Sequence, residues 1–148
     1  MGAQRRGRAG GAGGGRLLLA DAGMLAGFRR ARASLDQMDD ALADLQSDDL
    51  TIVVLADASL RRDLEDGDQD RFEQYRGDGT VTCAAAGSDG GHTGFMRAVA
   101  ERACRNGKFD EVLVLTARDL GSGGWTLARL GQVEGRWSLL EATPTQAA

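Results

Sequence analysis

Four apolar runs in this chain each lead into an aspartate, and this repetition constrains the fold more than any other feature of the sequence. An apolar run without polar alternation is typical of a strand covered on both faces, as in a parallel sheet. The runs are residues 17–20, 52–56, 81–88 and 112–115, and the aspartates are Asp21, Asp57, Asp89 and Asp119. Parallel strands end at one edge of a sheet, where open α/β folds place their ligand sites. The sequence therefore predicts that these carboxylates share one crevice.

Clustered carboxylates repel one another in water unless a cation neutralises them. Hard divalent cations prefer oxygen ligands, which carboxylates supply. The pattern therefore predicts a site for Mg²⁺ or Mn²⁺ at this edge of the sheet.

Helical patterns separate the strands. Residues 24–45 are predicted to form one amphipathic helix, because their apolar residues recur at steps of three and four. A second helical region starts near Ser59, is interrupted at residues 66–68 and stops at residues 77–79. A third follows the glycine-rich loop at residues 87–91 and ends at Asn106-Gly107.

Alternation of strands and helices predicts an α/β fold: a three-layer sandwich around a parallel sheet of four or five strands, in the order 3-2-1-4-5. Residues 125–130 and 136–140 form either a short hairpin or, in part, the fifth strand. At 148 residues one domain is expected, over residues 17–142. Residues 1–16 are expected to be a disordered, Gly- and Arg-rich tail and residues 143–148 a flexible end.

Composition limits the location and the partners. No apolar run approaches the roughly 20 residues that span a bilayer, so no membrane association is expected. Cys83 and Cys104 have no further cysteines to form a disulfide framework, which favours reduced thiols in the cytoplasm. Arginine supplies all but one of the 18 basic residues, which suggests a GC-rich bacterial source. Residues 17–148 carry 14 basic and 22 acidic residues, a net charge of −8 that gives no bulk attraction for nucleic acid.

Several functional classes lack their motifs. Asp21-Ala22-Gly23-Met24 follows the first strand instead of a glycine-rich dinucleotide loop, and the lone lysine, Lys108, is not part of a phosphate-binding loop. A Ser-His-Asp triad would have to use His92, and no Gly-x-Ser-x-Gly elbow accompanies it.

The sequence of this chain resembles that of the PIN-like nuclease superfamily, and within it the NYN and Regnase-like branch. The resemblance lies in the acid after the first strand, Ser-Leu-Arg-Arg after the second, a glycine-rich loop before the third helix and a Val-Leu-Thr strand before a late acid, and it covers residues 17–120. It implies a metal-dependent ribonuclease whose acids hold Mg²⁺ or Mn²⁺ and activate water for phosphodiester cleavage.

Position by position, the resemblance implies that Asp21 is the first-strand acid and Asp119 the late acid. Thr116-Ala117-Arg118-Asp119 sets that acid a residue or two later than the usual Ser/Thr-Asn-Asp. The middle acid of the family aligns with Thr93, which is no carboxylate, and Asp89 is the candidate to replace it. Asp21, Asp119 and Asp89 are therefore the predicted catalytic and metal-binding residues.

Four further residues are predicted to contact the substrate: Arg61, Arg118, His92 and Thr93. Arginines around the acidic crevice would hold a phosphate backbone, and the imidazole suits proton transfer. Plainer roles stay open for the acids, because aspartate commonly caps a helix or turn; for Asp57 a cap is the favoured role. The alternative function is a catalytically silent PIN-like module that binds RNA, expected to be single-stranded, or a protein. A homodimer and a Rossmann-like small-ligand domain also stay open.

Overall fold

A computed structural model describes residues 14–144 of the chain. Most of the predicted N-terminal tail, residues 1–13, and residues 145–148 lie outside this part. The first strand begins at Arg16 and the last ends at Pro144, so the sheet extends slightly beyond the predicted domain at both ends.

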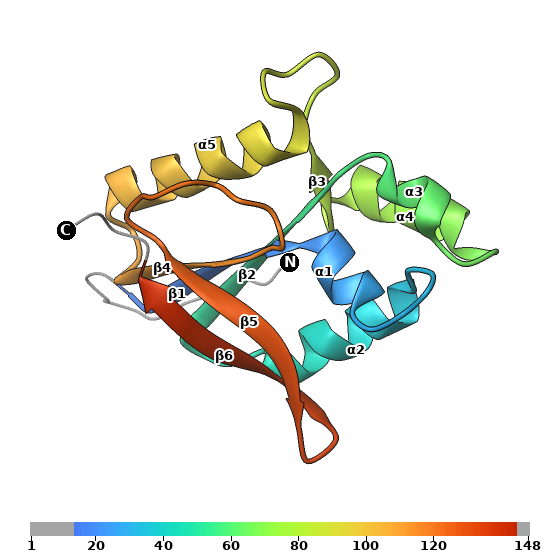
Figure 1. The fold of residues 1–148 in the computed structure, drawn as a ribbon, viewed down its shortest axis with the longest axis horizontal. Coiled ribbons are helices and arrows are strands. Elements are labelled where there is room, and N and C mark those ends of the chain that lie inside the picture. Colours follow the sequence, from blue (N-terminus) through green and yellow to red (C-terminus); the bar gives the residue numbers. More distant parts are fainter. Residues whose placement is uncertain (1–13, 145–148) are drawn as a thin grey trace.

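Within the described residues the chain forms six strands and five helices, which alternate through the first two thirds of the fold (Figure 1). Their bounds are β1 (Arg16–Asp21), α1 (Ala22–Gly27), α2 (Leu35–Leu45), β2 (Leu50–Ala56), α3 (Leu60–Asp63), α4 (Asp68–Asp78), β3 (Thr82–Cys83), α5 (Gly91–Asn106), β4 (Glu111–Leu115), β5 (Thr126–Val133) and β6 (Arg136–Pro144).

The six strands form one sheet in the order β3-β2-β1-β4-β5-β6, which confirms the predicted α/β architecture and extends it by one strand. All neighbouring strands are parallel except β5 and β6, which form an antiparallel hairpin. Leu18 of β1 lies opposite Ile52 of β2 on one side and Leu113 of β4 on the other. The strand order reverses beside β1, so the switch point predicted from the sequence lies at its end.

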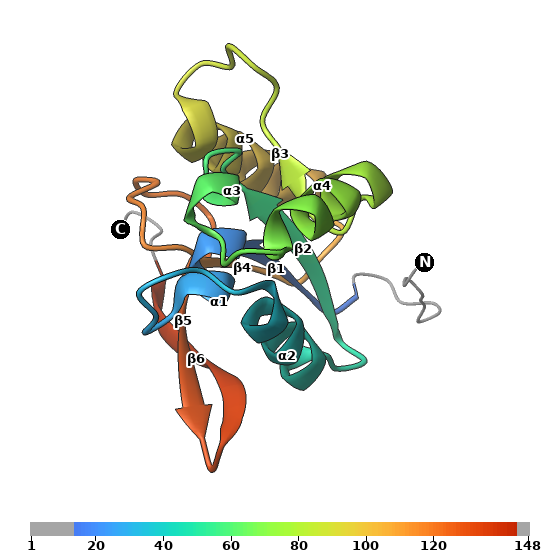
Figure 2. The same ribbon diagram turned by 90° about the vertical axis from the view of Figure 1, so that its right-hand side faces the viewer.

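Both faces of β1 are buried, which explains its unbroken apolar sequence. Leu18 and Ala20 belong to the core beneath α1 and α2, whereas Leu17 and Leu19 pack in the core beneath α5. Successive side chains of a strand point to opposite faces, so both faces need apolar residues. Helix α5 accordingly covers one face of the sheet and α1 and α2 the other, while the β5–β6 hairpin projects beyond the body (Figures 1 and 2).

The prediction of one helix over residues 24–45 is wrong, because the structure has two helices there. Arg29 adopts a left-handed backbone with φ of +58°, which a right-handed helix cannot continue through. Ser34 then starts α2 by accepting a hydrogen bond from the Gln37 amide at 3.2 Å. The apolar spacing continues across the break and therefore conceals it.

The other predicted boundaries agree more closely with the structure. The second helical region is interrupted at Gly67 and ends at Gly79, and α5 ends at Gly107; all three glycines are left-handed. The third strand has two residues and is much shorter than the apolar run at residues 81–88 that predicts it. Residues 125–130 and 136–140 satisfy both alternatives, since β5 joins the parallel sheet and also pairs with β6.

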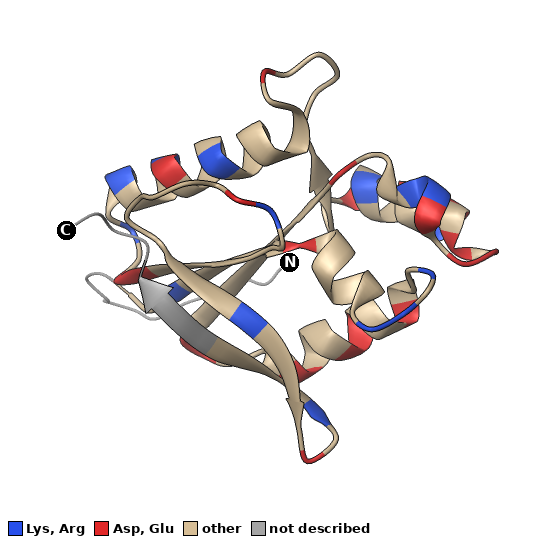
Figure 3. Cartoon of the chain, viewed as in Figure 1, with Lys and Arg blue, Asp and Glu red and all other residues tan. Residues whose placement is uncertain are grey.

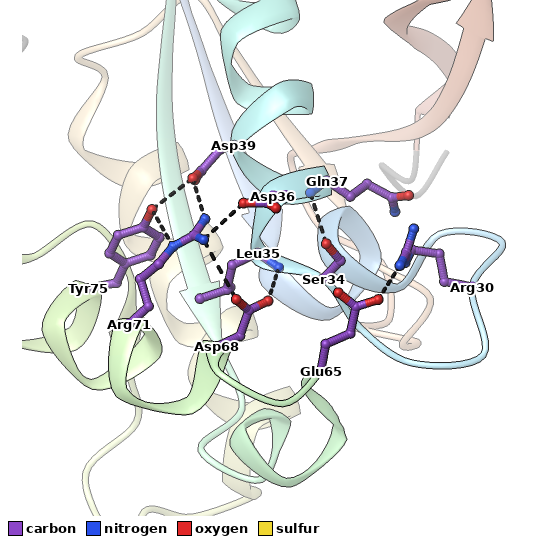
Figure 4. Close-up of polar contacts among 10 residues, drawn as sticks. All are labelled: Arg30, Ser34, Leu35, Asp36, Gln37, Asp39, Glu65, Asp68, Arg71 and Tyr75. Atoms are coloured by element: carbon purple, nitrogen blue, oxygen red, sulfur yellow. Dashed lines mark hydrogen bonds and ion pairs between the residues drawn. The ribbon is translucent and has the colours of Figure 1, made fainter.

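A polar network attaches α4 to α2 (Figure 4). Arg71 of α4 donates to Asp36 at 2.9 Å and to Asp39 at 2.7 Å, both on α2. Asp68 accepts the amide of Leu35, the first residue of α2, at 2.9 Å. Because that amide has no partner within its own helix, Asp68 supplies a cap from another element. The two helices therefore hold each other in place beside the sheet.

None of the helices in residues 14–144 is long and apolar enough to cross a membrane.

Candidate functional site

Asp21 lies at the end of the central strand β1 and begins α1. Its backbone is extended, and its Oδ1 accepts the amide of Gly23 at 3.2 Å, so the residue is the N-cap of α1. Capping is the plainer role that the sequence left open, and Asp21 fulfils it. The cap accounts for only part of what this carboxylate contacts.

The Asp21 carboxylate is buried with polar partners on both oxygens. His92 of α5 places Nε2 at 3.2 Å from Oδ1, and the hydroxyl of Thr116, after β4, donates to Oδ2 at 2.7 Å. Asp21 is 7% exposed and His92 6%. An ionised carboxylate is stable at such a depth only when hydrogen bonds and opposite charge replace its water shell. The end of β1 is therefore linked by hydrogen bonds to α5 and to the segment that follows β4.

The protonation of Asp21 follows from these contacts. Burial works to raise its pKa, but the hydrogen bonds from His92 and Thr116, with the charge of His92 and the Gly23 amide, outweigh it. The net effect lowers the pKa of Asp21 below its ordinary value of 3.8. The carboxylate is therefore ionised at neutral pH.

Arg118 spans the ends of three strands. Its Nη2 donates to Oδ2 of Asp57 at 2.9 Å, its Nη1 donates to the Thr93 hydroxyl at 3.0 Å, and its Nε lies 3.9 Å from Oδ2 of Asp21. Asp57 follows β2, Asp21 ends β1 and Arg118 follows β4. A single guanidinium therefore pairs with both carboxylates at this edge of the sheet, and its one positive charge offsets part of their combined negative charge.

Asp57 closes a local turn and also forms an ion pair. Its Oδ1 accepts the Ser59 amide at 3.0 Å and closes the turn before α3. The N-cap of α3 is Ser59, so the favoured prediction that Asp57 is the cap is wrong. The Oδ2 of Asp57 binds Arg118, which the sequence did not predict. The Ser59 hydrogen bonds and, more weakly, the charges of His92 and Arg118 outweigh burial and lower the pKa of Asp57.

The other two predicted acids do not join this cluster. Asp119 is exposed, and its Oδ1 accepts the amide of Gly121 at 2.8 Å, which closes its own turn. Asp89 is exposed in the loop between β3 and α5, and its side chain makes no hydrogen bond or ion pair with another described residue. Asp21 is thus the one member of the predicted acidic triad with polar contacts at the strand ends.

Of the residues predicted to contact the substrate, some lie in this cluster and one does not. His92 and Thr93 lie at the start of α5 and contact Asp21 and Arg118, respectively. Arg61 instead pairs with Glu73 of α4 at 3.1 Å.

The donor set does not fit a divalent ion in this arrangement. A hard cation needs about six oxygen ligands, but the Asp21 oxygens are held by His92 and Thr116, and Arg118 already pairs with Asp57. Within residues 14–144 no group of three or more His, Cys, Asp or Glu side chains is placed to hold a metal ion. Mg²⁺ or Mn²⁺ stays a prediction of the resemblance, without a matching set of ligands here.

A cavity of about 390 Å³ opens beside the cluster. Asp21, Asp57 and Arg118 line one side of it, and Phe28 and Arg29, which follow α1, line another. The guanidinium of Arg29 lies 5.0 Å from the centre of the Phe28 ring. Ligand access to the strand ends is therefore through a cavity that has both acidic and basic walls.

Sequence reasoning missed two contributors. The sequence predicts Thr116 only as part of a motif, although a hydroxyl at a strand end can donate a hydrogen bond to the acid of the neighbouring strand. For Asp57 the sequence favours only a local role, yet a carboxylate has two oxygens and can serve both a turn and an ion pair. The signal for Asp57 was its place after β2, next to β1.

No family model, curated protein or solved structure matches this chain.

Proposed function

We propose that this protein is a catalytically silent PIN-like module that binds single-stranded RNA, rather than a metal-dependent ribonuclease. The proposal keeps the family resemblance of the sequence and gives the strand-end cluster a binding role. A cytoplasmic location is part of it, since Cys83 and Cys104 are free thiols, as a reducing compartment favours.

The observation that carries the proposal is the bridge from Arg118 to Asp57 and Asp21. In the Ser/Thr-Asn-Asp spacing of the family, the acid stands two residues after the hydroxyl residue; two residues after Thr116 this chain has Arg118. An arginine at that position supplies the positive charge that a metal ion would supply. It also forms ion pairs with the carboxylates that would ligate the ion. Both effects oppose metal-dependent cleavage.

Binding of a phosphate backbone is supported by the donors that remain. A guanidinium has five N–H donors in a planar fork, and the Arg118 side chain is 41% exposed on the cavity. Arg29 lines the same cavity and has no carboxylate partner among the described residues. Arginine forks match phosphate oxygens in geometry and charge, so these two residues are the ones expected to contact RNA there.

The cluster beneath would act by positioning. Asp21 and Asp57 hold Arg118 by charge, and Thr93 accepts one of its N–H groups, so the guanidinium is oriented before a ligand arrives. His92 is buried and holds Asp21, which leaves it no contact with a ligand. Preorganised donors lose less conformational entropy on binding.

The test combines binding and cleavage on one preparation. A labelled single-stranded RNA should bind to the purified full-length protein and stay intact after prolonged incubation with Mg²⁺ or Mn²⁺. Calorimetric titration with Mn²⁺ should show no tight site. Metal-stimulated cleavage that Asp21→Asn abolishes would overturn the proposal and support the ribonuclease that the resemblance implies.

A further inference from the structure

A second cavity adjoins the one beside Arg118. It measures about 360 Å³ and lies along the loop between α1 and α2. The two cavities share the lining residues Gly23, Gly27, Leu60 and Asp63. They therefore form one continuous groove between α1, the α1–α2 loop and α3, which we call the arginine groove. It extends from the strand-end cluster to the far side of the loop.

The walls of the arginine groove are basic although the protein is acidic. Its five arginines are Arg29, Arg30, Arg32, Arg62 and Arg118. It has three carboxylates, and two of them, Asp21 and Asp57, are already paired with Arg118. In Figure 3, parts of the α1–α2 loop and of α3 have the blue colour of lysine and arginine. On a domain whose residues 17–148 carry a net charge of −8, this concentration of positive charge favours an anionic ligand.

Apart from Arg118, two of these arginines are held by other residues and two have no carboxylate partner among the described residues. Arg30 pairs with Glu65, and Arg32 donates to the Leu64 carbonyl, so both hold the loop against the segment after α3. Arg29 and Arg62 are exposed and have no carboxylate partner among the described residues. The guanidinium groups of this pair are therefore available to an anionic ligand without the loss of an existing ion pair.

Arg29 has an unusual backbone conformation and lies beside an aromatic ring. Its φ of +58° is uncommon for a residue with a side chain, and its guanidinium lies over the Phe28 ring. Bases of unpaired RNA stack on arginine planes, which a duplex does not offer. The exposed Arg29 is therefore suited to a single strand.

We infer that the arginine groove is the binding site for the backbone of single-stranded RNA, with Arg29 and Arg62 as its two free phosphate contacts. This inference rests on the proposed function and extends it, because it moves most of the binding surface from the strand ends to α1 and α3. The strand runs from Arg118, past Arg29, to Arg62. Arg30 and Arg32 keep the loop in the shape that this path requires.

The test compares two double variants that remove the same charge. Arg29→Gln with Arg62→Gln empties the groove of its free cations, whereas Arg102→Gln with Arg105→Gln removes two exposed arginines from α5, on the opposite face of the sheet. The probe is a short fluorescent oligouridylate, followed by anisotropy over a series of salt concentrations. Equal melting temperatures of the three proteins show that folding is unaffected.

The groove variant should bind at least about tenfold more weakly, and its plot of log K against log salt should be less steep by about 1.4, roughly 0.7 for each lost single-strand phosphate contact. The α5 variant should stay within about twofold of the wild type. Unchanged binding by the groove variant would overturn the site while leaving RNA binding intact. A wild type that binds no RNA would overturn the proposed function itself, and tighter binding of duplex RNA would overturn the assignment to single strands.

Discussion

The Nη2 of Arg118 lies 2.9 Å from Oδ2 of Asp57, and this ion pair crosses the end of β1. Asp57 follows β2 and Arg118 follows β4, the two neighbours of β1 in the sheet. Asp21, at the end of β1, lies beneath the bridge with Nε of Arg118 at 3.9 Å. The side chain thus ties together three strands whose sequences are far apart, at the edge where α/β proteins bind ligands.

Removal of this bridge should expose a latent cation site. Arg118→Ala leaves Asp21 and Asp57 without their shared positive charge, so the variant should gain Mn²⁺ binding at millimolar concentration that the wild type lacks. Isothermal titration calorimetry measures it. Arg118→Lys keeps a positive charge near the carboxylates and should behave as the wild type. Equal Mn²⁺ binding by wild type and Arg118→Ala would contradict the view that the guanidinium occupies the site.

Asp21→Asn should destabilise the fold by about 2 kcal/mol, since the amide keeps the shape but loses charge-assisted hydrogen bonds in a buried place. Urea denaturation measures the loss. Asp119→Asn is the matched control: this residue is exposed and its oxygen accepts only the Gly121 amide, which asparagine can also do, so its free energy of unfolding should change by less than about 0.5 kcal/mol.

The same Asp21 variant should alter the response to acid. Because the folded state lowers the pKa of Asp21 below 3.8, the carboxylate stabilises the fold fully above that pH, and the contribution is lost as the pH falls through the folded pKa. The difference in unfolding free energy between wild type and Asp21→Asn should therefore shrink as the pH falls below 3.8. A difference that grows on acidification would have the wrong sign.

Two helical glycines should respond oppositely to alanine. A methyl group at Gly94 in α5 would collide with the Asp89 carbonyl of the preceding loop, so Gly94→Ala should cost more than about 1 kcal/mol. At Gly77 in α4 nothing lies within 4 Å of the added methyl group, and Gly77→Ala should stabilise by up to about 1 kcal/mol through helix propensity. Thermal and urea denaturation of both variants check the pair; stabilisation by Gly94→Ala would contradict the packing described for that loop.

The cap that α4 provides to α2 should be measurable. Asp68→Ala removes the acceptor of the Leu35 amide and an ion pair with Arg71 at 3.6 Å, and should cost about 1 kcal/mol, as loss of an N-cap does. Asp66→Ala is its control, because that side chain is fully exposed and its one ion pair, to Arg32, spans 3.9 Å. An effect at Asp66 as large as that at Asp68 would show that net charge, not the cap, is responsible.

The strands of the sheet could be predicted because their burial is visible in composition. β1 and β4 have apolar residues on both faces, a pattern typical of strands buried in a parallel sheet. The order of the strands follows from the handedness of parallel crossovers. The break at Arg29 could not be predicted in this way. Apolar residues continue at helical spacing through it, and the left-handed turn depends on backbone torsion rather than on hydrophobic pattern.

The candidate site was partly predictable for a related reason. The place of Asp21 follows from the end of a strand, which the pattern locates to within a residue. The roles of Arg118 and Asp119 do not, since they are neighbours on one loop and their side chains take different directions: one crosses to Asp57, the other closes its own turn. A side chain on such a loop can bond either to a backbone amide two residues away or to a residue that is distant in the sequence. The sequence alone does not show which of these two hydrogen bonds forms.

The central place of β1 also affects how the chain emerges during synthesis. β1 is made first, but its partner β4 at Glu111–Leu115 comes almost a hundred residues later. One edge of a strongly apolar strand therefore stays without its partner until most of the protein has left the ribosome. The nascent protein passes through a long interval in which residues 16–21 are suited to pair with the wrong strand, and completion of β4 is the event that ends it.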